Sequence, residues 1–215
     1  MSDSREREKS SLNGTERTGS GRGTLPEGTV LNGRYKLEKV LGRGGFGITY
    51  KALDMNVQVD VAVKEYLTEP GEEPERAVRE AQISASLYDL EGIVAVRDYF
   101  IDRGIAYIVM EYVPGITVQQ RVERQGIFTP EEMLLVVEPL MNDLQKLHEK
   151  GMLHRDISPD NIILRPDGVA KLVDFGSARR TVLDAQGNNK SMTVVVRQQY
   201  TPKEQYSRNG KQGPW

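Results

Sequence analysis

Alternating apolar and polar positions predict β-strands in the first half of the chain. Apolar side chains alternate with polar ones in residues 35–41 and again in residues 48–52, on either side of a glycine-rich stretch. We therefore predict a hairpin with glycines at its tip. Residues 61–64 form a short run typical of a strand, and residues 106–113 form an apolar run that leads into a Pro-Gly turn. We predict strands there as well.

Helical spacing is found in two longer segments. Residues 74–90 carry apolar side chains mainly three or four positions apart, and Pro74 lies near the start, where a helix tolerates proline. The second segment begins with Thr129-Pro130-Glu131-Glu132, a capping box, and contains Pro139, which should kink the helix. The predicted apolar positions are Ala77, Val78, Ala81, Ala85 and Leu87 in the first helix and Met133, Leu134, Val137, Leu140, Met141, Leu144 and Leu147 in the second.

The composition is that of a globular protein without strong charge bias. The chain has 215 residues, of which 38% are hydrophobic, and a net charge of −2, so nucleic acid and membrane surfaces are not expected as its main partners. It has no cysteine, which excludes disulfides, thiol catalysis and zinc–cysteine sites and is compatible with the cytoplasmic location that we expect. No apolar run approaches the ~18 residues of a membrane-spanning helix, and the N-terminus lacks a signal-peptide core. Residues 1–25 have almost nothing to bury and are predicted to form a disordered tail.

Residues 154–176, HRDISPDNIILRPDGVAKLVDFG, place two aspartates and an asparagine in a fixed order. Asp156 can accept a proton from a hydroxyl group, while Asn161 and Asp174 can hold Mg²⁺ through oxygen ligands. Taken singly, each piece has an ordinary explanation, because Asp-Phe-Gly is a common loop tripeptide and Asn-Ile-Ile-Leu can open a buried strand. Their order and spacing favour phosphoryl transfer.

This stretch resembles the catalytic loop and the magnesium-binding motif of protein kinases. The resemblance implies that Asp156 is the catalytic base and that Asn161 and Asp174 are ligands of Mg²⁺, or of Mn²⁺. It gives His154 a structural role and implies that Arg155 contacts a phosphorylated activation segment. The alternative for Arg155 is a surface salt bridge of little energetic value.

The stretch LGRGGFGITYKA at residues 41–52 resembles the glycine-rich loop of kinases, in which backbone N–H groups close over phosphates. A dinucleotide-binding fold would instead show a helix after the last glycine. Lys64, at the end of Val-Ala-Val-Lys, matches the lysine that contacts the α- and β-phosphates. Its alternative is a solvated lysine at a strand end. Glu80 matches the helical glutamate that pairs with this lysine, and Glu75 is the second candidate.

Residues 106–115 resemble the strand and hinge that join the two kinase lobes. Met110 would be the gatekeeper, and the backbone of Glu111 and Val113 would bind the adenine edge. The apolar residues among these contacts are equally plausible as plain core residues. The resemblance implies nucleotide contacts from Leu41, Gly42, Gly44, Gly47, Thr49, Ala62, Lys64, Met110, Glu111, Val113, Ile163 and Asp174, and catalytic roles for Asp156, Lys64, Glu80 and Asn161.

Four features depart from the family pattern. Ser158 stands in place of a lysine that reaches the γ-phosphate, so either turnover is slower or another cation substitutes. Thr49 replaces a valine over the adenine, which should not prevent nucleotide binding. Residues 200–204, YTPKE, resemble the A-P-E motif with Lys203 in register for the glutamate, unless Glu204 takes that role. The chain ends at Trp215, before the long helix that follows in kinases, so we expect a fragment of a longer kinase and apolar surfaces without a partner.

The resemblance covers residues 30–215 and implies an α+β, bilobal fold with an N-lobe at 30–110, a hinge at 111–115 and a partial C-lobe at 116–215. GGFGITY and HRDISPDN are most similar to bacterial (Hanks-type) serine/threonine kinases. The implied function is transfer of the γ-phosphate of ATP to serine or threonine hydroxyls of proteins, with autophosphorylation as one option. Thr193 is the first candidate for phosphorylation, followed by Ser191 and Thr201. The alternatives are a non-catalytic pseudokinase or scaffold, suggested by Ser158, and a small-molecule phosphotransferase.

Overall fold

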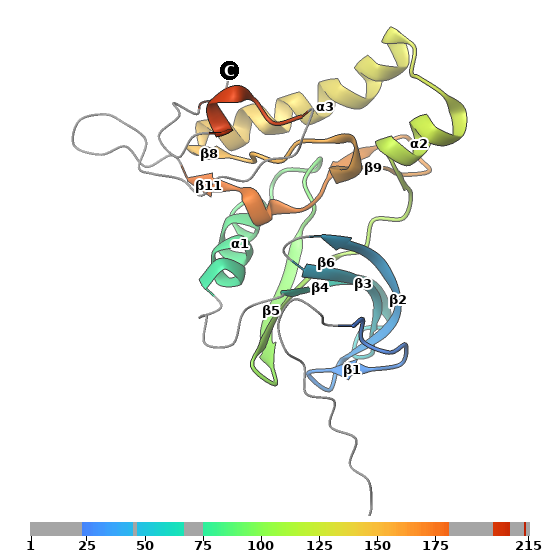
Figure 1. Cartoon of the computed structure of the whole chain (residues 1–215), viewed down its shortest axis with the longest axis vertical. Helices are drawn as coiled ribbons and strands as arrows, with labels where there is room; N and C mark the ends of the chain where they lie inside the picture. The colour runs from blue at the N-terminus through green and yellow to red at the C-terminus, as the bar shows by residue number, and fades with distance from the viewer. Residues whose placement is uncertain (1–22, 45–46, 67–74, 181–199, 207–212, 214–215) are drawn as a thin grey trace, which may run out of the picture.

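The first part of the chain is a curled antiparallel sheet of six strands in the order β1-β2-β3-β4-β6-β5 (Figure 1). The computed structural model describes residues 23–44, 47–66, 75–180, 200–206 and 213. The predicted hairpin is confirmed, because β2 and β3 pair from Tyr35 opposite Asp54 to Gly44 opposite Gly47. The strands are β1 (Val30–Leu31), β2 (Tyr35–Gly44), β3 (Gly47–Asp54), β4 (Val59–Tyr66), β5 (Val96–Asp102) and β6 (Ile105–Glu111).

Aromatic side chains hold the two ends of this sheet together. The ring of Phe100 on β5 stacks on Tyr35 of β2 at a centroid distance of 5.5 Å and on Tyr107 of β6 at 5.1 Å. The chain already contacts the sheet before β1, because the backbone N–H of Leu25 donates to the hydroxyl of Tyr50 on β3 at 3.0 Å. The tail predicted to be disordered therefore overlaps the folded part at Leu25, whereas residues 1–22 lie outside the described residues.

The first helix, α1 (Glu75–Ala85), is shorter than predicted. It ends at Ala85 because Ser86 bonds locally, its hydroxyl donating to the carbonyl of Ile83 at 2.6 Å, and turns follow. Ala85 was expected to face the core but is exposed, and the buried residue near this end of the helix is Ile83. Pro74 lies outside the described residues.

The second part of the chain is mainly helical, with short strands. The capping box of α3 is confirmed, because Thr129 accepts from the backbone N–H of Glu132 and Glu132 accepts from that of Thr129. Strand β9 pairs with both β10 and β7, and β8 pairs with β11. The elements are β7 (Ile116–Thr117), α2 (Val118–Gln125), α3 (Pro130–Glu149), β8 (Met152–Leu153), η1 (Pro159–Asn161), β9 (Ile162–Leu164), β10 (Ala170–Leu172), η2 (Phe175–Ser177), β11 (Arg179–Arg180) and η3 (Lys203–Tyr206).

Only part of the predicted apolar face of α3 is buried. Leu140 and Leu147 are buried as expected, together with Val136, which was not predicted. Leu134 and Met141 were predicted to face the core, but their exposed fractions are 63% and 61%. Pro139 lies inside the helix as predicted, and its kink stays a prediction.

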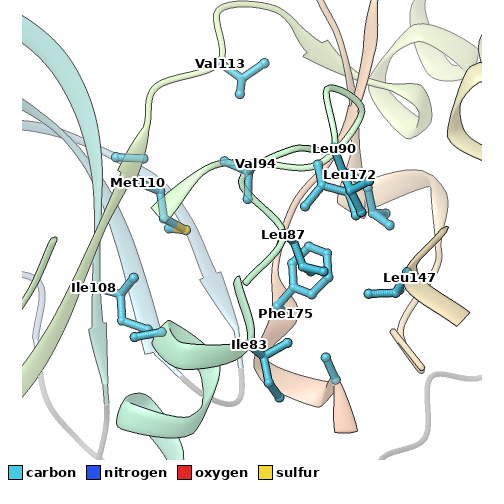
Figure 2. Packing of buried hydrophobic residues seen from close by; sticks show 14 of the residues in the cluster. Ile83, Leu87, Leu90, Val94, Ile108, Met110, Val113, Leu147, Leu172 and Phe175 are labelled. Carbon is cyan, nitrogen blue, oxygen red and sulfur yellow. The ribbon is translucent and has the colours of Figure 1, made fainter. Parts of the chain in front are cut away.

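The two parts share a hydrophobic core that runs from α1 to α3 (Figure 2). The segment after α1 lies between them and bonds to β10 through its backbone. The N–H of Val94 donates to the carbonyl of Leu172 at 3.0 Å, and the N–H of Leu172 donates to the carbonyl of Gly92 at 2.7 Å. The carboxylate of Asp143 on α3 accepts the N–H of Gly92 at 2.7 Å. A Cβ on Gly92 would lie 2.8 Å from that carboxylate, so the close approach requires glycine here.

This arrangement is the predicted α+β fold, a strand-rich lobe followed by a mainly helical one. The cleft described below lies between the two. Across the described part of the chain, no helix combines the length and the apolar character needed to cross a bilayer.

Candidate active site

A cavity of about 720 Å³ is lined by residues of both lobes. All of the predicted nucleotide contacts line it, and so does the predicted metal ligand Asn161. The predicted contacts are Leu41, Gly42, Gly44, Gly47, Thr49, Ala62, Lys64, Met110, Glu111, Val113, Ile163 and Asp174. Glu80 and Asp156 are not in its wall, but each is bonded to a residue that is. The volume lies within the range of sites that hold small-molecule cofactors.

The three predicted loop glycines have different reasons to be glycine. A Cβ on Gly47 would lie 2.1 Å from the backbone oxygen of Glu65, so the neighbouring strand excludes any side chain there. A Cβ on Gly42 or Gly44 would meet nothing within 4 Å, and neither residue has a left-handed backbone. Both line the cavity. Packing in the described structure therefore does not require glycine at these two positions, and the absence of side chains leaves room for a ligand close to the backbone.

Lys64 connects the strand-rich lobe to α1 and to the Asp-Phe-Gly motif. Its Nζ lies 3.0 Å from Oε1 of Glu80 and 2.6 Å from Oδ1 of Asp174, and it is 4% exposed. Burial alone would lower the pKa of Lys64, but the charges of Glu80 and Asp174 outweigh burial and hold this pKa above its ordinary value. Lys64 therefore carries a positive charge at the cavity wall. The second candidate partner, Glu75, begins α1, and its side chain lies outside the described part.

The catalytic loop holds Asn161 and Asp156 together. The side-chain amide Nδ2 of Asn161 donates to the backbone oxygen of Asp156 at 2.8 Å and to its Oδ2 at 3.0 Å. With Nδ2 used in this way, the Oδ1 atom of Asn161 is the atom of that amide suited to a cation. Asp156 is half-buried, so the residue keeps some contact with solvent.

Asp174 has a left-handed backbone, with φ of 67°. This conformation is uncommon outside glycine and is typical of residues held in place for function. The next residue, Phe175, packs edge-on against His154 with ring centroids 4.5 Å apart. Burial lowers the pKa of His154 to about 4, so this imidazole is neutral at pH 7.

An Mg²⁺ ion fits the donor set of the cleft. Asn161 and Asp174 offer one amide oxygen and one carboxylate, and both line the cavity. In the described part of the chain there is no cluster of three or more histidine, cysteine, aspartate or glutamate side chains that could hold a metal by themselves. Mg²⁺ characteristically uses one or two protein oxygens together with waters and phosphate oxygens, so this sparse set suits Mg²⁺ bound with a nucleotide.

The apolar part of the cavity contains Ala62, Met110, Val113 and Ile163, as predicted. It also contains Val94 and Val173, which the prediction missed. Val94 follows α1 in a segment without periodicity, so only its tertiary contact with β10 brings it here. Val173 directly precedes Asp174 in the motif, and that position was a signal that could have identified it.

The hinge residue Glu111 uses its side chain within the protein. Its Oε1 accepts the backbone N–H of Ala95 at 3.0 Å and pairs with Nζ of Lys171 on β10. The carboxylate is thus turned to the protein. The backbone N–H of Glu111 is also used there, because it donates to the carbonyl of Ala95 at 2.9 Å, so Glu111 does not offer this N–H to a ligand.

The departures from the family pattern have specific places in the structure. Ser158 is 2% exposed, and its hydroxyl has no hydrogen-bond partner among the described residues. It does not line the cavity, whereas Thr49 does. Lys203 and Glu204 lie in η3, where Lys203 is exposed. Thr193 and Ser191 lie outside the described residues, and Thr201 is half-buried.

Comparison with known proteins decides the family. Residues 35–214 match the protein kinase domain. The chain belongs to the protein kinase family. It is 37% identical over 188 residues to a probable serine/threonine-protein kinase, SCO3848, of Streptomyces coelicolor, an alignment that covers 84% of this chain and 28% of that protein.

Two further relatives are the probable serine/threonine-protein kinase PknB of Corynebacterium glutamicum and the serine/threonine-protein kinase PknA of Nostoc. Each is 36% identical, and each alignment covers 82% of this chain, with 28% and 34% of the respective relative. The kinase chain therefore spans about a third or less of the length of these relatives.

Proposed function

We propose that this chain is an ATP-dependent protein kinase that transfers the γ-phosphate to serine or threonine hydroxyls of proteins. The observation that carries the proposal is the position of Lys64, whose ammonium contacts both Glu80 and Asp174 at the wall of a cavity that also reaches Asn161. The cavity wall thus carries the cation of Lys64, the carboxylate of Asp174 and the carboxamide of Asn161, and these residues come from both lobes. The names of the relatives, all serine/threonine-protein kinases, support the same activity.

In this proposal each residue has one task. Lys64 binds the α- and β-phosphates, with Glu80 holding its side chain in place, and Asn161 and Asp174 hold the metal ion. A bound Mg²⁺, or Mn²⁺ in its place, would neutralise charge on the phosphate oxygens. The apolar slot with Ala62 and Val113 takes the adenine, beside the hinge backbone.

Asp156 orients the substrate hydroxyl and accepts its proton. The hydroxyl oxygen then forms a bond to the γ-phosphorus, the bond from that phosphorus to the β–γ bridging oxygen breaks, and ADP leaves. Asn161 fixes the carboxylate of Asp156 through the 3.0 Å bond to Oδ2, which lowers the cost of orienting the base. We also propose that this reaction takes place in the cytoplasm, where ATP is supplied, and that another copy of the chain is one substrate.

A pseudokinase without catalysis is the second candidate, and the observation that favours it is Ser158. Ser158 is uncharged, so this position supplies no cation to the γ-phosphate, and the residue is buried and does not line the cavity. Retention of Lys64, Asp156, Asn161 and Asp174 argues for the catalytic alternative, because a scaffold has no need of a base.

The test is transfer of label from γ-labelled ATP to a generic basic protein, followed by analysis of the labelled amino acids. We expect label on serine and threonine with the unaltered chain and at least about 100-fold slower labelling with Asp156→Asn. ATP binding without transfer would favour the pseudokinase. Label on small hydroxylated compounds but not on protein would favour the phosphotransferase.

A further inference from the structure

The peptide unit that joins Arg155 to Asp156 is held by a side chain at each of its two polar groups. Its carbonyl oxygen, on Arg155, accepts from Nε2 of Gln205 at 2.8 Å. Its N–H, on Asp156, donates to Nδ1 of His154 at 3.3 Å. The orientation of this peptide plane sets the direction in which the Asp156 side chain leaves the backbone.

This peptide unit needs such support. Arg155 has φ of 68°, a left-handed conformation that is unfavourable for a residue with a long side chain. Residues of this kind persist where the surroundings determine their conformation. The amide of Gln205 does so from a position that is 2% exposed, where water does not compete for the carbonyl.

Gln205 comes from a distant part of the chain. It lies 50 positions after Arg155, in η3, and its own N–H donates to the carbonyl of Pro202 at 3.0 Å. Thr201 and Pro202 directly precede this turn, in the stretch that resembles the A-P-E motif. The side chain of Gln205 therefore connects that stretch to the peptide that precedes the proposed base.

We infer that Gln205 is a positioning residue for Asp156, which it orients by binding the carbonyl of Arg155. The inference rests on the proposed function, in which Asp156 is the base. Nothing in the sequence pattern marks Gln205, because glutamine in a short turn is ordinarily a solvated residue.

The kinetic test uses Gln205→Met, which keeps the length of the side chain, cannot donate a hydrogen bond and adds no charge. The matched control is Lys203→Gln, an exposed position in the same η3 turn. With Gln205→Met we expect kcat for protein phosphorylation to fall about 10- to 100-fold, because a misplaced base lowers the rate of the chemical step. KM for ATP should change less than about twofold, since the nucleotide contacts are intact. An unchanged kcat, or the same loss with Lys203→Gln, would overturn the inference.

A second readout does not depend on activity. Hydrogen exchange of the Asp156 amide should accelerate at least about tenfold in Gln205→Met and stay unchanged in Lys203→Gln, because the peptide loses the hydrogen bond to its carbonyl. If the unaltered chain transfers no phosphate but the exchange difference is present, the proposed function fails and the positioning contact stands. Equal exchange in all three proteins would refute the contact itself.

Discussion

The ammonium of Lys64 lies 2.6 Å from Oδ1 of Asp174, although the two residues are 110 positions apart in sequence. Lys64 belongs to β4 of the strand-rich lobe, and Asp174 follows β10 in the helical lobe. The ion pair therefore spans the cleft. Because Glu80 of α1 contacts the same ammonium at 3.0 Å, this ammonium also ties α1 to the cleft.

Removing this ammonium should destabilise the fold. Lys64→Met removes the cation that the buried carboxylate of Glu80 contacts at 3.0 Å, and breaking a buried pair costs about 3–5 kcal/mol. Lys51→Met is the matched control, because Lys51 pairs at the surface with Glu38 and Asp60, where such pairs contribute about 1 kcal/mol or less. Urea unfolding of the two variants measures the difference. Equal losses of unfolding free energy would contradict the buried role of Lys64.

The loop glycines should separate stability from ligand binding. Gly47→Ala places a Cβ against the backbone of Glu65 and should lower the free energy of unfolding by about 1–3 kcal/mol. In Gly42→Ala the added Cβ meets no described atom within 4 Å, so the free energy of unfolding should change by less than about 0.5 kcal/mol. The same substitution should weaken binding of ATP with Mg²⁺. Denaturant unfolding and nucleotide titration test both statements. Full ATP affinity in Gly42→Ala would show that the cavity beside this residue is not the phosphate site.

His154 should make the fold less stable in acid. The unfolded chain takes up the histidine proton below about pH 6.5, whereas the folded chain does so only below about 4. Between these values the unfolded state binds more protons, so the free energy of unfolding falls as the pH drops from 6.5 to 4, by about 3 kcal/mol in total. Asp174 raises and Lys64 lowers this pKa, and both effects are smaller than that of burial.

The measurement is the unfolding free energy of the unaltered chain and of His154→Asn from pH 7 to pH 4. The difference between the two should shrink by about 3 kcal/mol on acidification. His148→Asn is the control at the second histidine of the chain, which is less buried and should show a smaller effect. A constant difference between His154→Asn and the unaltered chain would mean that His154 titrates normally.

The hydroxyl of Ser158 should contribute little to stability or to transfer. It is buried without a hydrogen-bond partner among the described residues, so Ser158→Ala should change the unfolding free energy by no more than about 1 kcal/mol and can even raise it. Transfer rates should stay within about twofold, because Ser158 does not line the cavity. A loss above 2 kcal/mol in unfolding free energy, measured with the same denaturant, would show that the hydroxyl has a strong partner.

The sequence was most informative where a pattern is local. Alternation predicted the hairpin of β2 and β3, and the Thr129-x-x-Glu132 spacing predicted the start of α3, because both depend on neighbours along the chain. The residues around Lys64 could be predicted from motif spacing. Their ion pairs became visible only when β4, α1 and β10 were brought together in space.

The errors arose where another element decides the burial of a side chain. Leu134 and Met141 have helical spacing, but no described element covers that side of α3, so both stay exposed. Val94 and Gln205 reach their sites through contacts between segments far apart in sequence. Periodicity indicates that a helix has an apolar face and does not indicate which element lies against it.

The most direct test of the account is the rate of phosphate transfer by Asp156→Asn, measured together with its affinity for ATP. The matched control is Asp167→Asn, which removes a carboxylate from an exposed turn that pairs with Arg165. We predict that Asp156→Asn lowers kcat about 10²- to 10⁴-fold while ATP affinity changes less than about twofold, because a base acts on the transferring proton and not on nucleotide binding. Equal transfer by Asp156→Asn and the unaltered chain would contradict the assignment of the base, and with it the proposed mechanism.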